Sequence, residues 1–156
     1  MSCLGVLFSL DGLTVNKLKS FSSDQERLYY LQEELEEIYF EKYPNYVAEL
    51  DKSWDALHRS LTNGKLEYNN GSYPLNHVVL GGEILYKGND YIMTLKTPEQ
   101  VKQIAEKIEK IDQATLQKGY VQINIKDYGF ELTEKDFEYT FTWFEESKEF
   151  WKVAAD

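Results

Sequence analysis

The sequence predicts an α+β fold, a single helix-rich domain over residues 1–156 with a small sheet of about three to four strands. Short apolar runs beside turn residues, at 3–10, 83–86 and 91–96, are typical of strands. Three longer runs carry apolar residues at helical spacing after a capping signal, at 23–42, 97–111 and 133–155. A domain of this size buries about 68–70% of its unfolded surface, so one hydrophobic core suffices without disulfides or a metal.

The first elements follow from apolar spacing and capping signals. Residues 3–10 form a short apolar run before a turn, which predicts a buried strand. Residues 14–21 predict a short helix with its apolar side chains directed inward. Ser23 and Glu26 have the spacing of a capping box, so a longer helix is expected to begin there and to end before Pro44.

The middle of the chain predicts one helix, one loop and one hairpin. The helix begins near Asp51 and ends at Asn63-Gly64, a pair typical of a C-terminal cap. The polar stretch 65–72 predicts a loop or a small hairpin. Residues 83–86 and 91–96 predict the two strands of a hairpin around the intervening turn.

The last third is mostly helical by the same criteria. Thr97, followed by a proline and a glutamine, predicts a capped helix, and 112–118 continue as a short second helix. Apolar and polar residues alternate within 120–130, which fits either a strand or an extended connection at a sheet edge. Thr133 caps a final helix toward Ala155 that is rich in aromatic residues.

Charge and cysteine content limit the class of partner. The chain has 27 acidic and 17 basic side chains, a net charge of −10 that repels nucleic acids and anionic lipids. We therefore expect no nucleic-acid or membrane partner, and the charge either steers a basic protein to the surface or simply maintains solubility. Cys3 is the single cysteine, and no signal-peptide pattern or membrane-length apolar run is present, so a cytoplasmic location is expected.

The segment around Trp54 and His58 is the first candidate for chemistry. On a helix, Asp51, Trp54, Asp55 and His58 lie on neighbouring parts of one surface. An imidazole titrates near neutral pH, and either aspartate is spaced to orient its ring. The favoured interpretation is nevertheless a histidine at the edge of the core that donates a structural hydrogen bond.

A second group of residues extends this candidate to a cleft. We expect Trp54, His58, His77, Gly81 and Gly82 to form its walls if the helix and the glycine pair meet. The simpler interpretation of the glycine pair is a tight turn, because the segment lacks the lysine and hydroxyl residue of a phosphate loop. Two histidines are too few for a metal site, so we expect no metal and no cofactor.

The final helix supplies a candidate partner surface. Tyr139, Trp143 and Phe150 belong to its broad aromatic arc, and aromatic side chains dominate the anchors of protein interfaces. Core packing is the simpler interpretation of the same arc.

The order of motifs resembles the YfbM-like family, small bacterial proteins with a domain of unknown function. The most specific pieces are Leu-Asp-Lys-Ser-Trp-Asp-Ala-Leu-His at 50–58 and Val-Leu-Gly-Gly-Glu at 79–83. The similarity extends from Cys-Leu-Gly at 3–5 through Thr-Pro-Glu-Gln at 97–100 to Phe-Trp-Lys-Val-Ala-Ala at 150–155. The resemblance implies an α+β fold and a bacterial cytoplasmic setting, and it implies no catalytic residues.

Three functional hypotheses remain. The leading one is a protein-binding domain without enzymatic activity, comparable to a bacterial immunity protein that neutralises a basic toxin. The second is a small-molecule site or enzyme centred on Trp54 and His58. The third is a homodimer in which the aromatic surface of the last helix is buried against its own copy.

Overall fold

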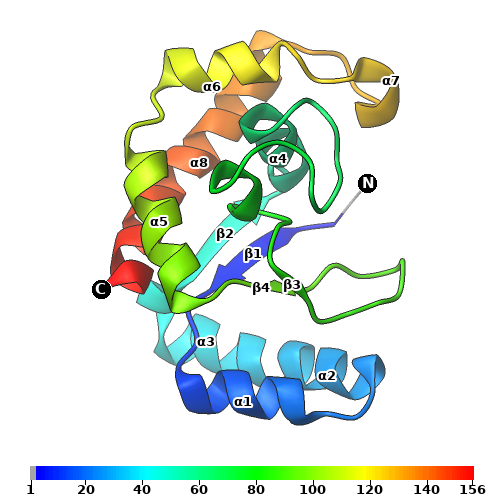
Figure 1. The fold of residues 1–156 in the computed structure, drawn as a ribbon, viewed down its shortest axis with the longest axis vertical. Coiled ribbons are helices and arrows are strands. Elements are labelled where there is room, and N and C mark those ends of the chain that lie inside the picture. The colour runs from blue at the N-terminus through cyan, green and yellow to red at the C-terminus, as the bar shows by residue number, and fades with distance from the viewer. Residues whose placement is uncertain (1–2) are drawn as a thin grey trace.

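The computed structural model describes residues 3–156, and it has the expected α+β architecture. A lower layer of α1–α3 and an upper group of α4, α5, α6 and α8 enclose the β1–β2 ribbon (Figure 1). The elements, in chain order, are β1 (Gly5–Phe8), α1 (Gly12–Ser20), α2 (Asp24–Tyr30), a π-helical segment (Leu31–Leu35), α3 (Glu36–Lys42), β2 (Val47–Asp51), α4 (Trp54–Leu61), β3 (Glu83–Ile84), β4 (Thr94–Leu95), α5 (Pro98–Glu109), α6 (Gln113–Tyr120), α7 (Ile125–Tyr128) and α8 (Glu134–Ala155). Short 3-10 turns occur at Pro44–Tyr46 and Leu75–His77.

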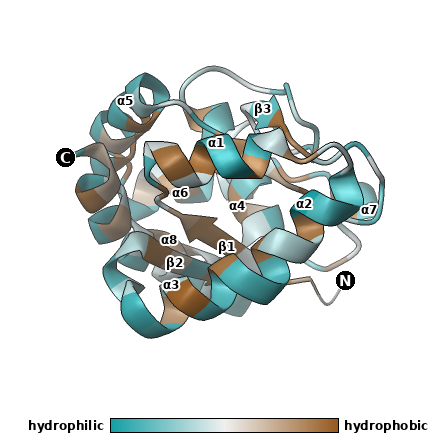
Figure 2. Cartoon of the chain, turned by 90° about the horizontal axis from the view of Figure 1, so that it is seen from below, coloured by the Kyte–Doolittle hydropathy of each residue, from teal (hydrophilic) through white to brown (hydrophobic). Residues whose placement is uncertain are grey.

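The β1–β2 ribbon separates two hydrophobic cores. Its strands are antiparallel, with Leu7 opposite Ala48 and Phe8 opposite Val47. Because side chains alternate along a strand, Leu7 and Ala48 contact the upper core, whereas Phe8 and Val47 contact the lower one. Figure 2 views the lower layer from below, with α1–α3 in front of β1 and β2.

The upper core is the larger of the two. It contains side chains from α4, α5, α6 and α8 that are at most 1% exposed, namely Leu57, Ile104, Leu116 and Phe144. The lower core contains Leu18, Leu35 and Tyr39 from the α1–α3 layer and Met93 from the β3–β4 hairpin. Among the helices of residues 3–156, none has both the length and the apolar composition required to cross a membrane.

The capping signals are confirmed where the sequence placed them. The Ser23 hydroxyl accepts a hydrogen bond from the Glu26 backbone N–H, but the Glu26 carboxylate accepts from the Ser22 hydroxyl, so only half of the expected capping box forms. Thr97 forms a complete capping box with Gln100. The Thr133 hydroxyl accepts from the Asp136 N–H at the start of α8. The helix expected over 23–42 is continuous, with a π-helical segment at its centre.

The strands differ from the expectation in their arrangement. They form two separate two-stranded sheets, β1–β2 and β3–β4, instead of one sheet. Strand β2 was not predicted, because its short mixed sequence gains regular structure only by pairing with β1 more than 35 residues earlier. The hairpin is present, but its regular ladder is limited to Glu83 opposite Leu95 and Ile84 opposite Thr94.

The expectation of a strand or extended connection within 120–130 is wrong, because residues Ile125–Tyr128 form the short helix α7. The Asn124 side chain accepts from the Asp127 N–H at its start, and Gly129 ends it with φ of 83°. These local caps outweigh the alternation of Val121, Ile123 and Ile125 with polar residues. Ile123 is buried, but Val121 and Ile125 are more than half exposed.

Candidate functional site

A cavity of about 490 Å³ opens where the start of α4 faces the connection between α7 and α8. Cys3 at the start of the described chain forms part of its rim. Its walls combine aromatic, acidic and hydroxyl side chains with one lysine. The lining residues are Cys3, Lys52, Ser53, Trp54, Asp55, Tyr128, Phe130, Glu131, Thr133, Asp136 and Tyr139.

Trp54 is the first residue of α4 and packs one wall of the cavity against β1. Its indole Nε1 donates to the Cys3 carbonyl at 3.0 Å. A Cβ atom at Gly5 would lie 2.8 Å from the Trp54 Cβ, closer than real Cβ contacts allow. The glycine therefore lets strand β1 approach the indole, and together they fix the ring at the cavity wall.

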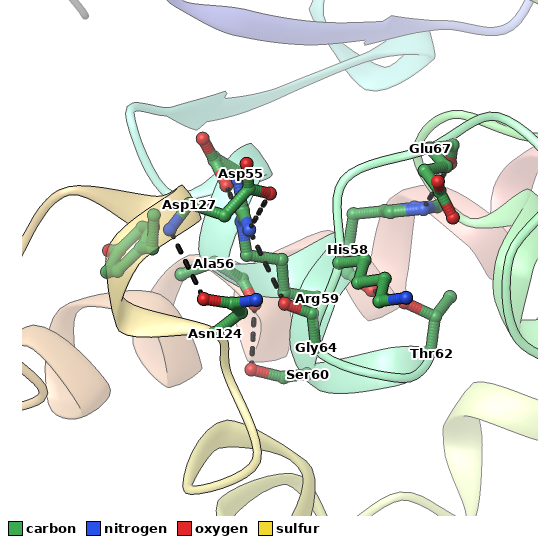
Figure 3. Close-up of polar contacts among 12 residues, drawn as sticks. Asp55, Ala56, His58, Arg59, Ser60, Thr62, Gly64, Glu67, Asn124 and Asp127 are labelled. Carbon is green, nitrogen blue, oxygen red and sulfur yellow. Dashed lines mark hydrogen bonds and ion pairs between the residues drawn. The ribbon is translucent and has the colours of Figure 1, made fainter.

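A buried arginine joins α4 to α7 (Figure 3) and contacts two residues that line the cavity, Asp55 and Tyr128. Arg59 is 3% exposed; its Nε donates to Asp55 Oδ1 at 2.5 Å and its Nη1 donates to Asp127 Oδ2 at 2.8 Å. Its guanidinium also lies over the Tyr128 ring, 5.6 Å from the centroid. Burial lowers the pKa of Arg59, but the two carboxylates more than offset this, so the pKa is raised and the charge is fixed.

Asp136, which also lines the cavity, holds two tyrosines. Its Oδ2 accepts from the Tyr120 hydroxyl at 2.7 Å and from the Tyr128 hydroxyl at 2.8 Å. The pKa of both phenols is raised, mainly by burial and in addition by the hydrogen bond to Asp136. Both hydroxyls therefore stay protonated donors, and Tyr128 is fixed through its ring by Arg59 and through its hydroxyl by Asp136.

Tyr139 closes the cavity beside the end of β2. Its hydroxyl donates to the Asp51 carboxylate and accepts from the Lys52 N–H at 3.1 Å. Asp51 has φ of 51°, a left-handed conformation that short polar side chains tolerate better than most residues. Asp51 thus turns the chain from β2 toward α4 and positions Tyr139, but it is not itself a wall of the cavity.

The composition of the walls favours a positively charged organic group. Trp54, Phe130 and Tyr139 supply aromatic rings, whose faces attract cations, and a fourth ring, that of Tyr128, is already covered by Arg59. The charged lining side chains are three carboxylates and one ammonium, Asp55, Glu131, Asp136 and Lys52. This cavity is therefore the candidate functional site.

His58 lies in the core and faces away from the cavity. Its side chain is 0% exposed, and Figure 3 shows it directed toward Glu67, on the other side of α4 from Asp55. Nε2 lies 2.8 Å from both the Glu67 carbonyl and the Asn70 Oδ1, which are acceptors, so Nε2 carries the proton. Neither aspartate orients the ring, since Asp51 bonds Tyr139 and Asp55 bonds Arg59.

We expect the burial of His58 to make stability depend on pH. Burial is the main cause that lowers the His58 pKa, so the folded protein keeps the ring neutral where the unfolded chain protonates it. The contribution of neutral His58 to the free energy of unfolding is complete above the pKa of the residue in the unfolded chain, about 6.5. It is lost as pH falls through the lower pKa of His58 in the folded protein. Urea unfolding at pH 7 and pH 5 measures it, and His58→Gln should lose less stability across this interval than the wild type. Equal losses would contradict the prediction.

The other residues of the predicted cleft lie elsewhere. His77, Gly81 and Gly82 form a separate group, in which a Cβ on Gly81 would lie 2.6 Å from the His77 Nδ1. Gly82 has φ of 126°, and a Cβ there would lie 2.4 Å from the Leu95 carbonyl oxygen. The structure therefore brings Trp54 and Asp55 together at the cavity but leaves His77 and the glycine pair outside its walls.

The three aromatic residues predicted as a partner surface are also separated. Tyr139 lines the cavity, and the half-buried Trp143 packs edge-on against it with 6.4 Å between ring centroids. Phe150 is 7% exposed and belongs to the upper core. Core packing thus explains Phe150, near the C-terminal end of α8. Of the three predicted surface residues, Tyr139 lines the cavity.

Several site residues were missed by sequence reasoning. Arg59 carried a usable signal, because it follows Asp55 by four residues on a predicted helix. Tyr128 and Phe130 lie in the segment whose secondary structure was ambiguous. Asp136 is three residues after Thr133, the cap of α8, so the sequence indicates only a residue of the first helical turn. Its hydrogen bonds to Tyr120 and Tyr128 depend on the tertiary fold.

Comparison with other proteins identifies a family. Within residues 3–156 no group of three or more His, Cys, Asp and Glu side chains is placed to hold a metal ion. The chain has no match among the curated proteins and none among the solved structures. One family model covers residues 1–156, the full length of the sequence. The chain therefore belongs to the family described as "Domain of unknown function (DUF1877)".

Proposed function

We propose that this chain is a binding protein for a basic partner protein, and that the cavity at Trp54 receives a lysine or arginine side chain of that partner. The observation that carries the proposal is the combination, around one cavity, of three carboxylates and one lysine with three aromatic rings besides Tyr128, whose ring Arg59 already covers. A cation over an aromatic face gains about 0.5–1 kcal/mol when exposed and about 2 kcal/mol when desolvated. Rings and carboxylates together therefore favour a cationic group over a neutral one.

Two of the carboxylates keep free acceptor capacity. Arg59 Nε bonds only one oxygen of Asp55, and both tyrosines bond the same oxygen of Asp136. An ionised carboxylate has two oxygens with about four acceptor sites, so each retains room for a donor from a ligand. The internal bonds hold these groups rigid in advance, which reduces the entropy lost on binding.

The overall charge supports a basic macromolecule as the source of that cation. A net charge of −10 attracts positively charged proteins over long distances and raises their association rate. This is the behaviour required of an immunity-like protein that neutralises a basic toxin. We propose this role in the bacterial cytoplasmic setting that the YfbM-like resemblance implies.

A small organic cation is the second candidate ligand. The cavity volume of about 490 Å³ lies within the range of about 300–1,000 Å³ that is typical of small-molecule sites. In that case the ligand alone should bind as tightly as the same group carried on a peptide.

A peptide titration tests the proposal. The probe is Arg-Gly-Arg-Gly-Arg amide, followed through the Trp54 indole N–H in heteronuclear NMR spectra at low and moderate salt, with N-acetyl-arginine amide as the single-residue comparison. Glu131→Lys reverses an exposed charge at the cavity, and Glu106→Lys makes the same change on the outer face of α5. We expect Glu131→Lys to weaken peptide binding about tenfold at low salt and Glu106→Lys to change it little.

The outcomes separate the hypotheses. Equal weakening by both substitutions would show that net charge alone attracts the peptide, and no saturable shift of the Trp54 signal would exclude the cavity; either result overturns the proposal. Equal affinity for the peptide and for N-acetyl-arginine amide would support the small-cation candidate instead. A solution mass of two chains, with cavity signals that change on dilution, would support the homodimer.

A further inference from the structure

Aromatic side chains at the end of α3 and in the turn that follows it form an exposed surface. Phe40 is 43% exposed, Tyr43 47% and Tyr46 44%, and the rings of the two tyrosines are in contact with 6.5 Å between centroids. Figure 2 views the molecule from this side, where hydrophobic segments of α3 lie beside hydrophilic ones. Single exposed apolar residues need no explanation, whereas contiguous ones mark interaction sites. We refer to Phe40, Tyr43 and Tyr46 as the α3 aromatic face.

Two rings of the lower core support this face from beneath. The Phe8 ring of β1 contacts the rings of Phe40 and Tyr39 edge-on, each with 6.0 Å between centroids. Tyr39 is 8% exposed, and its ring lies 5.4 Å from that of Tyr43. The exposed rings are therefore continuous with buried ones. This packing holds them in place in advance and reduces the entropy lost when a partner binds.

Carboxylates surround the α3 aromatic face. Residues 31–50 contain six glutamates and one lysine, and none of these glutamates belongs to an ion pair within residues 3–156. Glu36 lies about one helical turn before Phe40, and the exposed Glu41 follows that ring directly. Burial raises the pKa of Glu36, and the charge of Glu33 raises it further. A cation bound here would therefore relieve repulsion between carboxylates.

This charge decides which kind of partner fits the face. A second copy of the chain docked through the same face would bring its own glutamates against these, and anionic lipids and nucleic acids would be repelled as well. A basic protein segment is attracted instead. Arginine suits the face better than lysine, because a guanidinium group stacks on aromatic rings and bonds a carboxylate through two parallel hydrogen bonds.

We propose that the α3 aromatic face docks an arginine-containing segment of a partner protein. Guanidinium groups of that segment lie over the exposed tyrosine rings and pair with the neighbouring glutamates, and its apolar side chains pack against Phe40. The face shares no residue with the cavity at Trp54, and α3 lies on the opposite side of the β1–β2 ribbon from α4 (Figure 1). It is therefore a second contact surface that does not depend on the cavity.

A peptide titration of the intact chain tests the proposal. The probe is acetyl-Arg-Leu-Arg-Leu-Arg amide, and acetyl-Lys-Leu-Lys-Leu-Lys amide is the comparison with equal charge. In heteronuclear NMR spectra the backbone amides of Tyr43 and Tyr46 report the α3 aromatic face, while the indole N–H of Trp54 reports the cavity. We expect saturable shifts at both tyrosine amides, and binding of the lysine peptide at this face that is about threefold weaker.

Matched substitutions separate the contribution of the rings from that of the charge. Tyr43→Ser removes one ring of the face, and Tyr29→Ser removes a ring of α2 that is 66% exposed. We expect the first to weaken binding about threefold and the second to change it little. Glu41→Lys leaves every ring in place and should weaken binding about fivefold at low salt, whereas Glu106→Lys on α5 should have little effect.

Each outcome bears on one proposal. Equal affinity for the two peptides, or equal effects of the substitutions and their controls, would show that net charge alone attracts the probe and would overturn this proposal. A solution mass of two chains, with Tyr43 and Tyr46 signals that change on dilution, would also overturn it, because a second copy would then cover the face. Shifts at these tyrosines without a shift at Trp54 would support the α3 aromatic face and contradict the cavity, and the reverse result would overturn the face alone.

Discussion

Replacement of Gly119 by alanine should destabilise the fold more than alanine at any other glycine of this chain. A Cβ on Gly119 of α6 would lie 1.8 Å from the Ser60 carbonyl oxygen of α4, so the two helices would have to separate. Such overpacking against backbone costs about 3 kcal/mol of unfolding free energy or more. Urea unfolding measures the loss.

Gly12 provides the matched control for this substitution. It is the first residue of α1, and a Cβ built on it meets no heavy atom within 4 Å. Gly12→Ala should change stability by less than about 1 kcal/mol, in the stabilising direction because alanine favours the helix. Similar midpoints for the two variants would show that α4 and α6 can separate without cost.

Arg59→Met should be the second large change. It removes the guanidinium that bonds Asp55 and Asp127 and covers the Tyr128 ring, and so leaves two carboxylates close together without their shared cation. Because the Asp127 side chain is more than half exposed, water replaces part of the lost interaction with its carboxylate. The expected decrease in the free energy of unfolding is about 2–3 kcal/mol. Amide exchange at Tyr128 and Gly129 should accelerate as α7 loosens.

An exposed ion pair serves as the control. Lys152 Nζ lies 3.4 Å from Glu109 Oε1, and both side chains are more than half exposed. Lys152→Met should therefore lower the free energy of unfolding by less than about 0.5 kcal/mol. Equal losses for Arg59→Met and Lys152→Met would contradict the assignment of Arg59 as a buried link between α4 and α7. Unchanged exchange at Gly129 would do the same.

Local signals explain why the helices could be predicted. The bonds at Ser23, Thr97 and Thr133 each involve residues within three positions, so their spacing in the sequence already specifies them. Strand β2 depends instead on pairing with β1, and no local sequence pattern predicts it. In α7 the apolar alternation competed with the Asn124 cap, and the cap prevailed.

The candidate site was predictable only in part, for a related reason. Trp54 and Asp55 were selected from one helix, and both line the cavity. The remaining walls come from the connection between α7 and α8 and are held by bonds such as Tyr128 to Asp136, which join segments that only the tertiary fold brings together. His58 has the titratable chemistry of an active-site residue, yet its burial depends on the loop carrying Glu67 and Asn70.

The bond between the Trp54 indole and the Cys3 carbonyl affects how the protein should be handled. It places the beginning of the described chain at the rim of the cavity, whereas α8 ends on the opposite side of the molecule (Figure 1). An affinity tag or fluorophore attached before Cys3 would compete with ligands for this opening, and a maleimide label on the exposed thiol would do the same. Tags and reporters for binding measurements belong on the side of the molecule where α8 ends.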